Sequence, residues 1–328
     1  MKVTVLVNVF NGAKTLDRCI KSILNQSYEN CEIILWDNQS TDNTKELIRK
    51  YDDIRLRYFY APVHTCLYDA RNQALKHANG DLVAILDIDD WWVECKLEKQ
   101  VEFFNDQSIG LVYSNFYEVN EKSGKTRIKY VNTLPSGQIT KELVRNYIVG
   151  SLTIMYRRTL KVEKGLKFNP KYNHIGDFDF VVRFSEHCNI KAIQEPLAYC
   201  SWGIDNLSIQ KSDEYIEELK NWVENDLKSI KSLKDKNKEK KKFLNEIKYA
   251  QWKQIGKNKN TKKIKDLLPV IIVVLYRMPK IIREQGIRLY QNYRKILGWL
   301  VYMNLEKHEF IYFRGNTGEI KIRKFPEK

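Results

Sequence analysis

Residues 83–92 read Val-Ala-Ile-Leu-Asp-Ile-Asp-Asp-Trp-Trp, and the rest of the chain is best interpreted around them. Five consecutive apolar residues, Leu82–Leu86, predict a short buried strand. Asp87, Asp89 and Asp90 follow at once, and carboxylates this close repel one another unless a cation neutralises them. In an extended segment Asp87 and Asp89 point to the same side, so one divalent ion could contact both. The alternative is an acidic turn that caps the next helix.

The net charge of +15 is unevenly distributed along the 328 residues. Residues 1–210 hold 27 Lys+Arg against 26 Asp+Glu, whereas residues 211–328 hold 29 against 15. A basic segment permits nucleic-acid binding. This one lies outside the acid-rich part of the chain, and no recognised nucleic-acid motif accompanies it. We therefore expect no nucleic-acid partner.

The cysteines and the N-terminus both indicate a cytoplasmic protein. Six cysteines show no Cys-x-x-Cys and no framework spacing, which favours reduced thiols. Met1-Lys2 leads into an apolar run that Asn8 interrupts, with no small-residue cleavage site, so a signal peptide is not predicted.

Strands and helices are predicted to alternate four times in the first ninety residues. This alternation is typical of an α/β fold with a mostly parallel sheet flanked by helices. Ligands of such sheets bind outside the carboxyl ends of the strands. Phe10-Asn11, Asp37 and Asp87–Asp90 all follow predicted strands, and we expect them to meet in one crevice. The predicted strands cover residues 3–10, 32–36, 54–60 and 82–86.

The first turn, Asn8–Ala13, has no glycine-rich phosphate loop of the dinucleotide or P-loop kind. If a nucleotide binds here, a metal ion must hold its phosphates. A sugar nucleotidyltransferase would need a Gly-rich first loop bearing Arg or Lys, which this chain lacks.

Several motifs together resemble family 2 glycosyltransferases of GT-A fold. The resemblance covers roughly residues 1–210. It implies an inverting enzyme that uses a nucleoside-diphosphate sugar, with a UDP-sugar as the expected donor, and Mn²⁺ or Mg²⁺ as cofactor. The matching segments are Val3–Asn11, Ser22–Tyr28, Asp37–Thr44, Ala70-Arg71-Asn72, Asn79-Gly80-Asp81 and Leu86–Asp90.

Site residues follow from this resemblance by position. Phe10 and Asp37 would hold the base, Asp87 the ribose side, and Asp89 the metal together with Asp87 and Asp90. From the residues alone, Phe10 could equally be a core aromatic and Asp37 a helix cap. Two departures affect the nucleotide side: Asn-Val-Phe-Asn replaces the common Pro-Thr-Tyr-Asn, and Asp37-Asn38 replaces a pair of acids. The predicted nucleotide-sugar residues are Asn8, Phe10, Asn11, Asp37, Arg71 and Asp87.

Asp177 is the candidate general base. It resembles the aspartate of the family's second acidic motif, although Gly176 stands where glutamate is common. A hydroxyl acceptor must lose its proton as it attacks, and a carboxylate can take it. The alternative for Asp177 is a helix N-cap. Gly203–Ser208 resembles the closing His-x-x-Asn-x-Ser motif with glycine in place of histidine, and His174 is a spatial substitute or a structural residue.

Residues 211–328 are predicted to be a basic, mainly helical extension. The apolar run Leu267–Tyr276 is too short to span a bilayer. With its basic and aromatic flanks it suits an anionic membrane surface, and a helix buried against the catalytic domain is the alternative.

The sequence therefore predicts a GT-A-like catalytic domain (1–210) followed by this extension (211–328). The predicted function is transfer of a sugar, a hexosyl or related group, to a glycan or lipid-linked acceptor in cell-surface polysaccharide assembly. The alternatives are a sugar nucleotidyltransferase or a non-catalytic glycan- or nucleic-acid-binding protein. The expected location is cytoplasmic, with peripheral attachment to the cytoplasmic face of the membrane through the extension.

Overall fold

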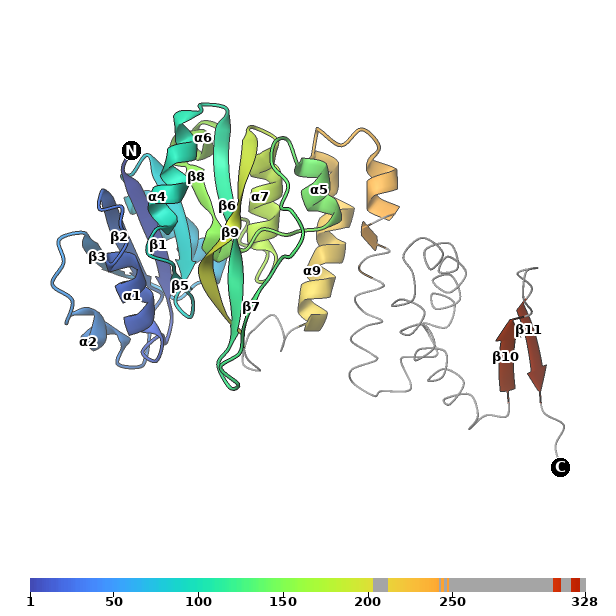
Figure 1. Ribbon diagram of the computed structural model, residues 1–328, viewed down its shortest axis with the longest axis horizontal. Helices are drawn as coiled ribbons and strands as arrows, with labels where there is room; N and C mark the ends of the chain where they lie inside the picture. Colours follow the sequence, from blue (N-terminus) through green and yellow to red (C-terminus); the bar gives the residue numbers. More distant parts are fainter. Residues whose placement is uncertain (203–211, 242, 245–246, 248–308, 314–319, 325–328) are drawn as a thin grey trace. The chain divides into compact units, whose positions relative to one another are not determined.

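The computed structural model describes residues 1–202, 212–241, 243–244, 247, 309–313 and 320–324. The chain divides into two compact units, Met1–Ile247 and Lys248–Lys328. The first unit is an α/β domain built on one mixed sheet (Figure 1). The predicted fold class is confirmed.

The sheet has nine strands in the order β3-β2-β1-β4-β8-β6-β9-β5, with β7 paired to β6. The half from β3 to β4 is entirely parallel, as predicted. The other half is mixed: β8 pairs antiparallel with β4 and β6, β5 with β9, and β7 with β6. The strands are β1 Val3–Val9, β2 Cys31–Asp37, β3 Leu56–Tyr60, β4 Leu82–Asp87, β5 Trp91–Trp92, β6 Ile109–Asn120, β7 Thr126–Ile128, β8 Met155–Arg157 and β9 Asn189–Trp202.

The helices cover both faces of this sheet (Figure 1). Helices α1, α2 and α4 pack over one core, and α3, α5, α7 and α9 over the other. They are α1 Leu16–Leu24, α2 Thr44–Ile48, α3 Leu67–Ala74, α4 Lys96–Val101, α5 Thr140–Arg145, α6 Arg158–Glu163, α7 Gly176–Ser185 and α9 Ser212–Asn225, with 3-10 turns η1 Leu75–His77, η2 Glu102–Asn105, η3 Ser151–Thr153 and η4 Leu227–Ser229.

Strand β1 shows why the two cores form. Its seven residues are all buried, and successive side chains alternate between the two faces. Val5 and Val7 belong to the core under α1, while Leu6 belongs to the core under α3. Burial on both faces explains the unbroken apolar runs. The carboxyl ends of β1, β2 and β4 lie at one edge because these strands pair in parallel.

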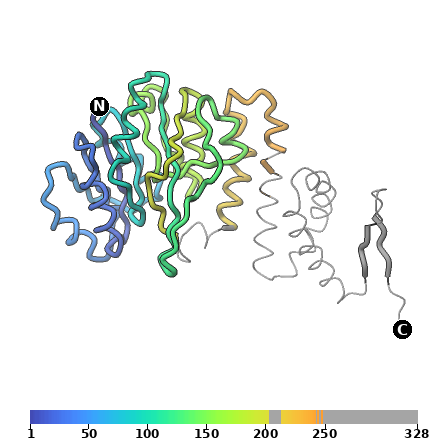
Figure 2. The backbone as a smooth tube through the Cα atoms, viewed as in Figure 1, coloured from blue at the N-terminus to red at the C-terminus, as the bar shows by residue number. Residues whose placement is uncertain are grey.

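Register then brings the predicted polar residues together at that edge. In the parallel pairs Asn8 lies opposite Asp87, and Val9 lies opposite Asp37. Strands far apart in the sequence also meet, since β6 and β9 run side by side through the centre of the unit (Figure 2). The expected convergence of strand ends is therefore present.

Helix α9 packs with the core of the first unit although it follows residue 210. Trp222 of α9 is fully buried in the core that α3 and α7 share. The first compact unit consequently runs to Ile247, while a separation of function at residue 210 stays a prediction.

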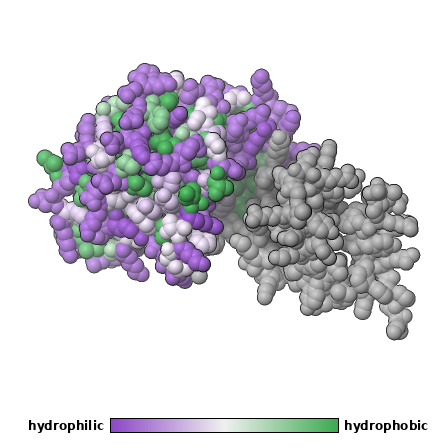
Figure 3. All heavy atoms as spheres, viewed as in Figure 1, coloured by the Kyte–Doolittle hydropathy of each residue, from purple (hydrophilic) through white to green (hydrophobic). Residues whose placement is uncertain are grey.

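The visible face of the described part is largely hydrophilic, with apolar residues scattered over it (Figure 3). None of the helices in the described part of the chain has the length and apolar character that a membrane crossing requires. The predicted motif at 203–208 and the apolar run at 267–276 lie outside the described residues. Within the second unit, β10 Glu309–Phe313 and β11 Ile320–Lys324 pair antiparallel, so that part of the extension is not helical.

Candidate active site

Asp87, at the end of β4, is held from two sides. Its Oδ1 accepts a hydrogen bond from Arg71 of α3, and its Oδ2 accepts one from Ser151 Oγ at 3.0 Å. Arg71 is buried, so its charge needs the partner that Asp87 provides. The Asp87 carboxylate is therefore fixed in orientation before any ligand binds.

Asn8 lies beside Asp87 with its hydrogen-bonding capacity unused. The two residues are opposite each other in the β1–β4 pair. The Asn8 side chain is buried, and neither Oδ1 nor Nδ2 has a partner. Nε of Arg71 is likewise buried without a partner. Buried polar atoms almost always have partners, so these orphaned atoms point to a polar ligand at this edge.

Asp89 and Asp90 lie in different environments. The Asp89 residue is exposed, but the protein around its carboxyl group reduces its hydration. This loss of hydration and the charge of Asp87 raise the pKa of Asp89 to about 6. Asp90 is buried, and its Oδ1 accepts a hydrogen bond from the Ser201 amide at 2.9 Å. Burial and the charges of Asp89 and Asp87 hold the pKa of Asp90 well above its usual range. Of the three acids, Asp89 is thus the most exposed, Asp87 is partly exposed and Asp90 is buried.

The acids suit a divalent cation but do not form a complete metal site by themselves. Among the described residues, no three His, Cys, Asp or Glu side chains are gathered as a ready-made metal site. The donor set is carboxylate oxygen, which Mg²⁺ and Mn²⁺ prefer. A cation beside Asp89 would offset both the loss of hydration and the repulsion from Asp87 that raise the pKa of Asp89. Mg²⁺ characteristically takes one or two carboxylates and completes its shell with substrate phosphates and water.

Phe10 offers an open aromatic ring at the end of β1. Its side chain is 48% exposed, so the alternative of a core aromatic is excluded. The ring lies against His64, with centroids 4.6 Å apart, and His64 Nδ1 contacts the Asn38 carbonyl oxygen at 2.8 Å. Asn11 then turns the chain with φ of 50°, a left-handed conformation that asparagine tolerates. The Phe10 ring is available for stacking on a base.

Asp37 is fully buried and shapes the neighbouring turn. Its Oδ1 accepts the Ser40 amide at 2.7 Å, and its Oδ2 accepts the Tyr58 hydroxyl at 2.8 Å. The N-cap of α2 is Asn43, so Asp37 does not cap that helix. A contact between Asp37 and a nucleotide base stays a prediction.

Asp177 lies in the first turn of α7, two residues after the N-cap Ile175, so it is not the cap. Tyr68 Oη donates to its Oδ1 at 3.4 Å. Burial raises the pKa of Asp177, and the positive charge of Arg71 offsets part of that rise. A carboxyl group with a raised pKa in a site of opposite charges is a reasonable general-base candidate.

The glycine before Asp177 has a steric reason. A Cβ at Gly176 would lie 2.5 Å from the ring of Tyr68, closer than real Cβ atoms come to other heavy atoms. The glutamate that is common at this place would displace Tyr68, whose hydroxyl contacts Asp177. The close packing of the Tyr68 ring therefore requires a glycine at position 176.

Sequence reasoning missed Tyr68, Ser151 and Tyr147. Tyr147 Oη is buried and has no hydrogen-bond partner. Its pKa is held well above the usual range, mainly by burial and to a smaller extent by the charge of Asp177. No local motif marks these residues, because only the fold brings them to Asp87 and Asp177. A search of the sequence for a hydroxyl donor to each acid would have had many equal candidates.

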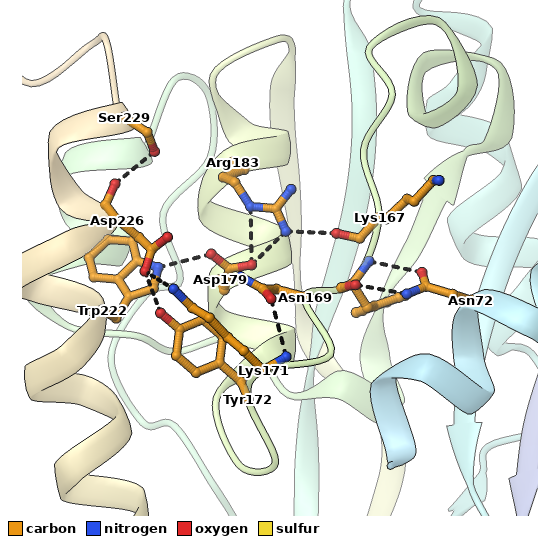
Figure 4. Close-up of polar contacts among 11 residues, drawn as sticks. Asn72, Lys167, Asn169, Lys171, Tyr172, Asp179, Arg183, Trp222, Asp226 and Ser229 are labelled. Carbon is orange, nitrogen blue, oxygen red and sulfur yellow. Dashed lines mark hydrogen bonds and ion pairs between the residues drawn. The ribbon is translucent and has the colours of Figure 1, made fainter. Parts of the chain in front are cut away.

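One further acid and one histidine have structural partners. Asp179 is buried between Arg183 and the indole of Trp222 (Figure 4). His174 Nε2 contacts Glu214 Oε2 of α9 at 3.2 Å. The suggested replacement of the missing closing histidine by His174 therefore finds no support, since this ring is engaged by α9.

Residues 4–166 match the family described as glycosyl transferase family 2. EpsE of Bacillus subtilis, a glycosyltransferase by name, is 30% identical over 189 residues, which are 56% of this chain and 67% of EpsE. The chain belongs to glycosyl transferase family 2. It is an enzyme of the inverting type that transfers glycosyl groups.

Two other similarities extend over most of the chain. WfgD of Escherichia coli, named as a UDP-Glc:alpha-D-GlcNAc-diphosphoundecaprenol beta-1,3-glucosyltransferase, is 28% identical over 234 residues, 70% of this chain and 89% of WfgD. The crystal structure of S. aureus TarS 1-349 superimposes with a TM-score of 0.60 at 19% identity, covering 75% of this chain and 71% of that one. The TarS likeness shows the shared GT-A fold.

Proposed function

We propose that this family 2 enzyme transfers a sugar from a UDP-sugar to a glycan carried on a lipid diphosphate, with Mn²⁺ or Mg²⁺ held at Asp89. Two relatives support these substrates. WfgD is named for UDP-Glc and for a GlcNAc-diphosphoundecaprenol acceptor, and TarS has been solved with UDP and with UDP-GlcNAc. Family membership argues against the two alternatives, a nucleotidyltransferase and a non-catalytic binding protein.

The observation that carries the proposal is that one buried arginine, Arg71, interacts with both acids. Its guanidinium binds Asp87 directly, and its charge lowers the pKa that burial raises at Asp177. A donor site at Asp87 and a base at Asp177 would therefore be neighbours. This is the arrangement that transfer from a donor to a deprotonated acceptor requires.

On the donor side, the orphaned amide of Asn8 and the fixed carboxylate of Asp87 would bind polar groups of the nucleoside. The exposed ring of Phe10 would stack on the base. A cation held by Asp89, with the neighbouring carboxylate of Asp87, would supply positive charge against the leaving diphosphate.

On the acceptor side, Asp177 would accept the proton of the attacking hydroxyl. Tyr68 Oη lies 3.4 Å from Asp177 Oδ1 and orients that carboxylate. The attack comes from the face opposite the diphosphate, which inverts the anomeric carbon. The orphaned hydroxyl of Tyr147 is available to an acceptor sugar on the same side.

The experiment that tests this function is a panel of nucleotide sugars with the full-length protein, read out as nucleoside diphosphate released. UDP-sugars should be turned over with Mn²⁺ or Mg²⁺, and EDTA should stop the reaction. Asp89→Ala should remove the difference between metal and EDTA in UDP binding. Turnover of no UDP-sugar, or turnover that EDTA leaves unchanged, would contradict the donor or the metal.

We further propose that residues 211–328 hold the enzyme at an anionic membrane surface, where a lipid-linked acceptor lies. The support is their excess of 29 basic over 15 acidic residues, since each Lys or Arg near such a surface gains about 1 kcal/mol. The protein should sediment with phosphatidylglycerol vesicles at low salt and be partly released at high salt. Failure to bind them at low salt would overturn this part.

A further inference from the structure

Glu218 of α9 binds the backbone that leads into α7. Its Oε1 accepts the amide of Asn173 at 2.7 Å, and its Oε2 accepts the amides of His174 at 2.9 Å and Ile175 at 3.1 Å. These three residues directly precede α7, whose first turn carries Asp177. The first amides of a helix and its approach have no partner within the helix, so one carboxylate from a distant segment satisfies them.

Helix α9, together with Asp226 directly after it, binds the same segment at further points. Trp222 Nε1 donates to the buried Asp179 Oδ1 at 2.9 Å (Figure 4). Asp226 Oδ2 accepts from Lys171 Nζ and from Tyr172 Oη, both at 2.5 Å. The chain from 171 to 179 is thus bound along the length of α9.

We propose that Glu218 is a positioning residue for the transfer reaction, which sets the backbone from which Asp177 reaches the acceptor. The inference rests on the proposed role of Asp177 as the base. Both α7 and α9 lie beyond residues 4–166, so this device belongs to the part of the chain that the family match does not cover.

A carboxylate is needed because two oxygens accept three amides. Glutamine at 218 has the same shape, but its single carbonyl oxygen leaves an NH₂ group facing at least one backbone N–H. The turn before Asp177 would then shift. A misplacement of about 1 Å can cost about 10²-fold in rate, whereas the other contacts of α9 keep the fold.

The test compares Glu218→Gln with Glu217→Gln on the full-length protein. Glu217 is the matched control, because it has the same residue type on the same helix and is exposed in an ion pair with Lys220. Turnover of UDP-glucose and UDP-GlcNAc with Mn²⁺ is measured, together with UDP affinity and thermal unfolding. Glu218→Gln should lower kcat about tenfold or more with UDP affinity unchanged, and Glu217→Gln should change neither.

A double variant separates positioning from a general structural effect. In the Asp177→Asn background, Glu218→Gln should cost less than twofold, because the group it positions is already disabled. An equal loss in both backgrounds, or wild-type turnover of Glu218→Gln, would overturn the inference. Wild-type turnover of Asp177→Asn alone would instead overturn the proposed function, so the two failures are distinguishable.

Discussion

The hydrogen bond from Trp222 to Asp179 should contribute measurably to the stability of the catalytic unit. Trp222 is fully buried and Asp179 is 1% exposed, with 2.9 Å between Nε1 and Oδ1. Trp222→Phe removes the donor, and Arg183 still binds the other carboxylate oxygen. An unsatisfied charged acceptor costs about 2–3 kcal/mol, and the smaller ring leaves a void that costs about 1 kcal/mol more.

We therefore expect Trp222→Phe to lower the free energy of unfolding by about 3 kcal/mol, or Tm by about 6–12 °C for a unit of this size. Urea unfolding followed by circular dichroism measures the first quantity, and calorimetry the second. Trp202→Phe is the matched control, because Trp202 is 42% exposed and should change stability by less than about 0.5 kcal/mol. A loss below about 0.5 kcal/mol for Trp222→Phe would refute the assigned contribution of this bond.

Two more predictions concern Glu32 and Ser151. Although burial opposes it, hydrogen bonds from the Asn79 amide, Thr4 and Lys2 lower the pKa of Glu32 from its ordinary 4.5 to about 2, which corresponds to about 3 kcal/mol of stability. Because the pKa is lower in the folded state, this stability is present above about pH 4.5 and is lost as the pH falls toward 2. In urea unfolding, Glu32→Gln should therefore be less stable than wild type at pH 7 and should approach wild-type stability near pH 2. A loss of stability that does not change with pH would contradict this linkage. Ser151→Ala removes the 3.0 Å hydrogen bond to Asp87. The variant should bind UDP in the presence of Mn²⁺ about fivefold more weakly, or by about 1 kcal/mol, as measured by titration calorimetry. Unchanged affinity would show that Ser151 does not orient Asp87 for the nucleotide.

The strand ends were predictable because their signals are local. Leu82–Asp87 forms β4 as expected, and its apolar run is buried on both faces. Strand β5 was not expected, since two residues carry no periodic pattern and Trp91 pairs with the distant Tyr199. The helix after the three acids, α4, begins at Lys96 with Cys95 as its N-cap, so Asp87, Asp89 and Asp90 do not cap it. Ser151, whose surrounding sequence favours a strand, lies in the 3-10 turn η3 and donates a hydrogen bond to Asp87.

The sequence predicted individual residues of the site, but it could not predict which side chains and amides bind them. Sequence motifs selected Arg71 and Asp87 separately, and only the packing of α3 against β4 makes them a pair. Asp90 was grouped with the metal acids by adjacency, yet its Oδ1 binds the amide of Ser201, 111 residues away. Trp222 shares an apolar stripe at helical spacing with Tyr215, Leu219, Leu227 and Ile230, so a helix with one buried face could be expected there, and Trp222 is buried. Its hydrogen bond to Asp179 could not be predicted, because only the packing of α9 against α7 brings the two residues together.

The central claim is that Asp177 is the general base of a UDP-sugar transferase, and its most direct test is the turnover of Asp177→Asn. Asparagine keeps the shape and cannot accept the proton, so kcat should fall about 10²-fold or more while UDP affinity in Mn²⁺ stays within about twofold. In the wild type, kcat should fall as the pH drops through a value above the ordinary pKa of an aspartate, because burial raises the pKa of Asp177 and the base is active only when deprotonated. Wild-type turnover of Asp177→Asn with intact UDP binding would contradict the claim.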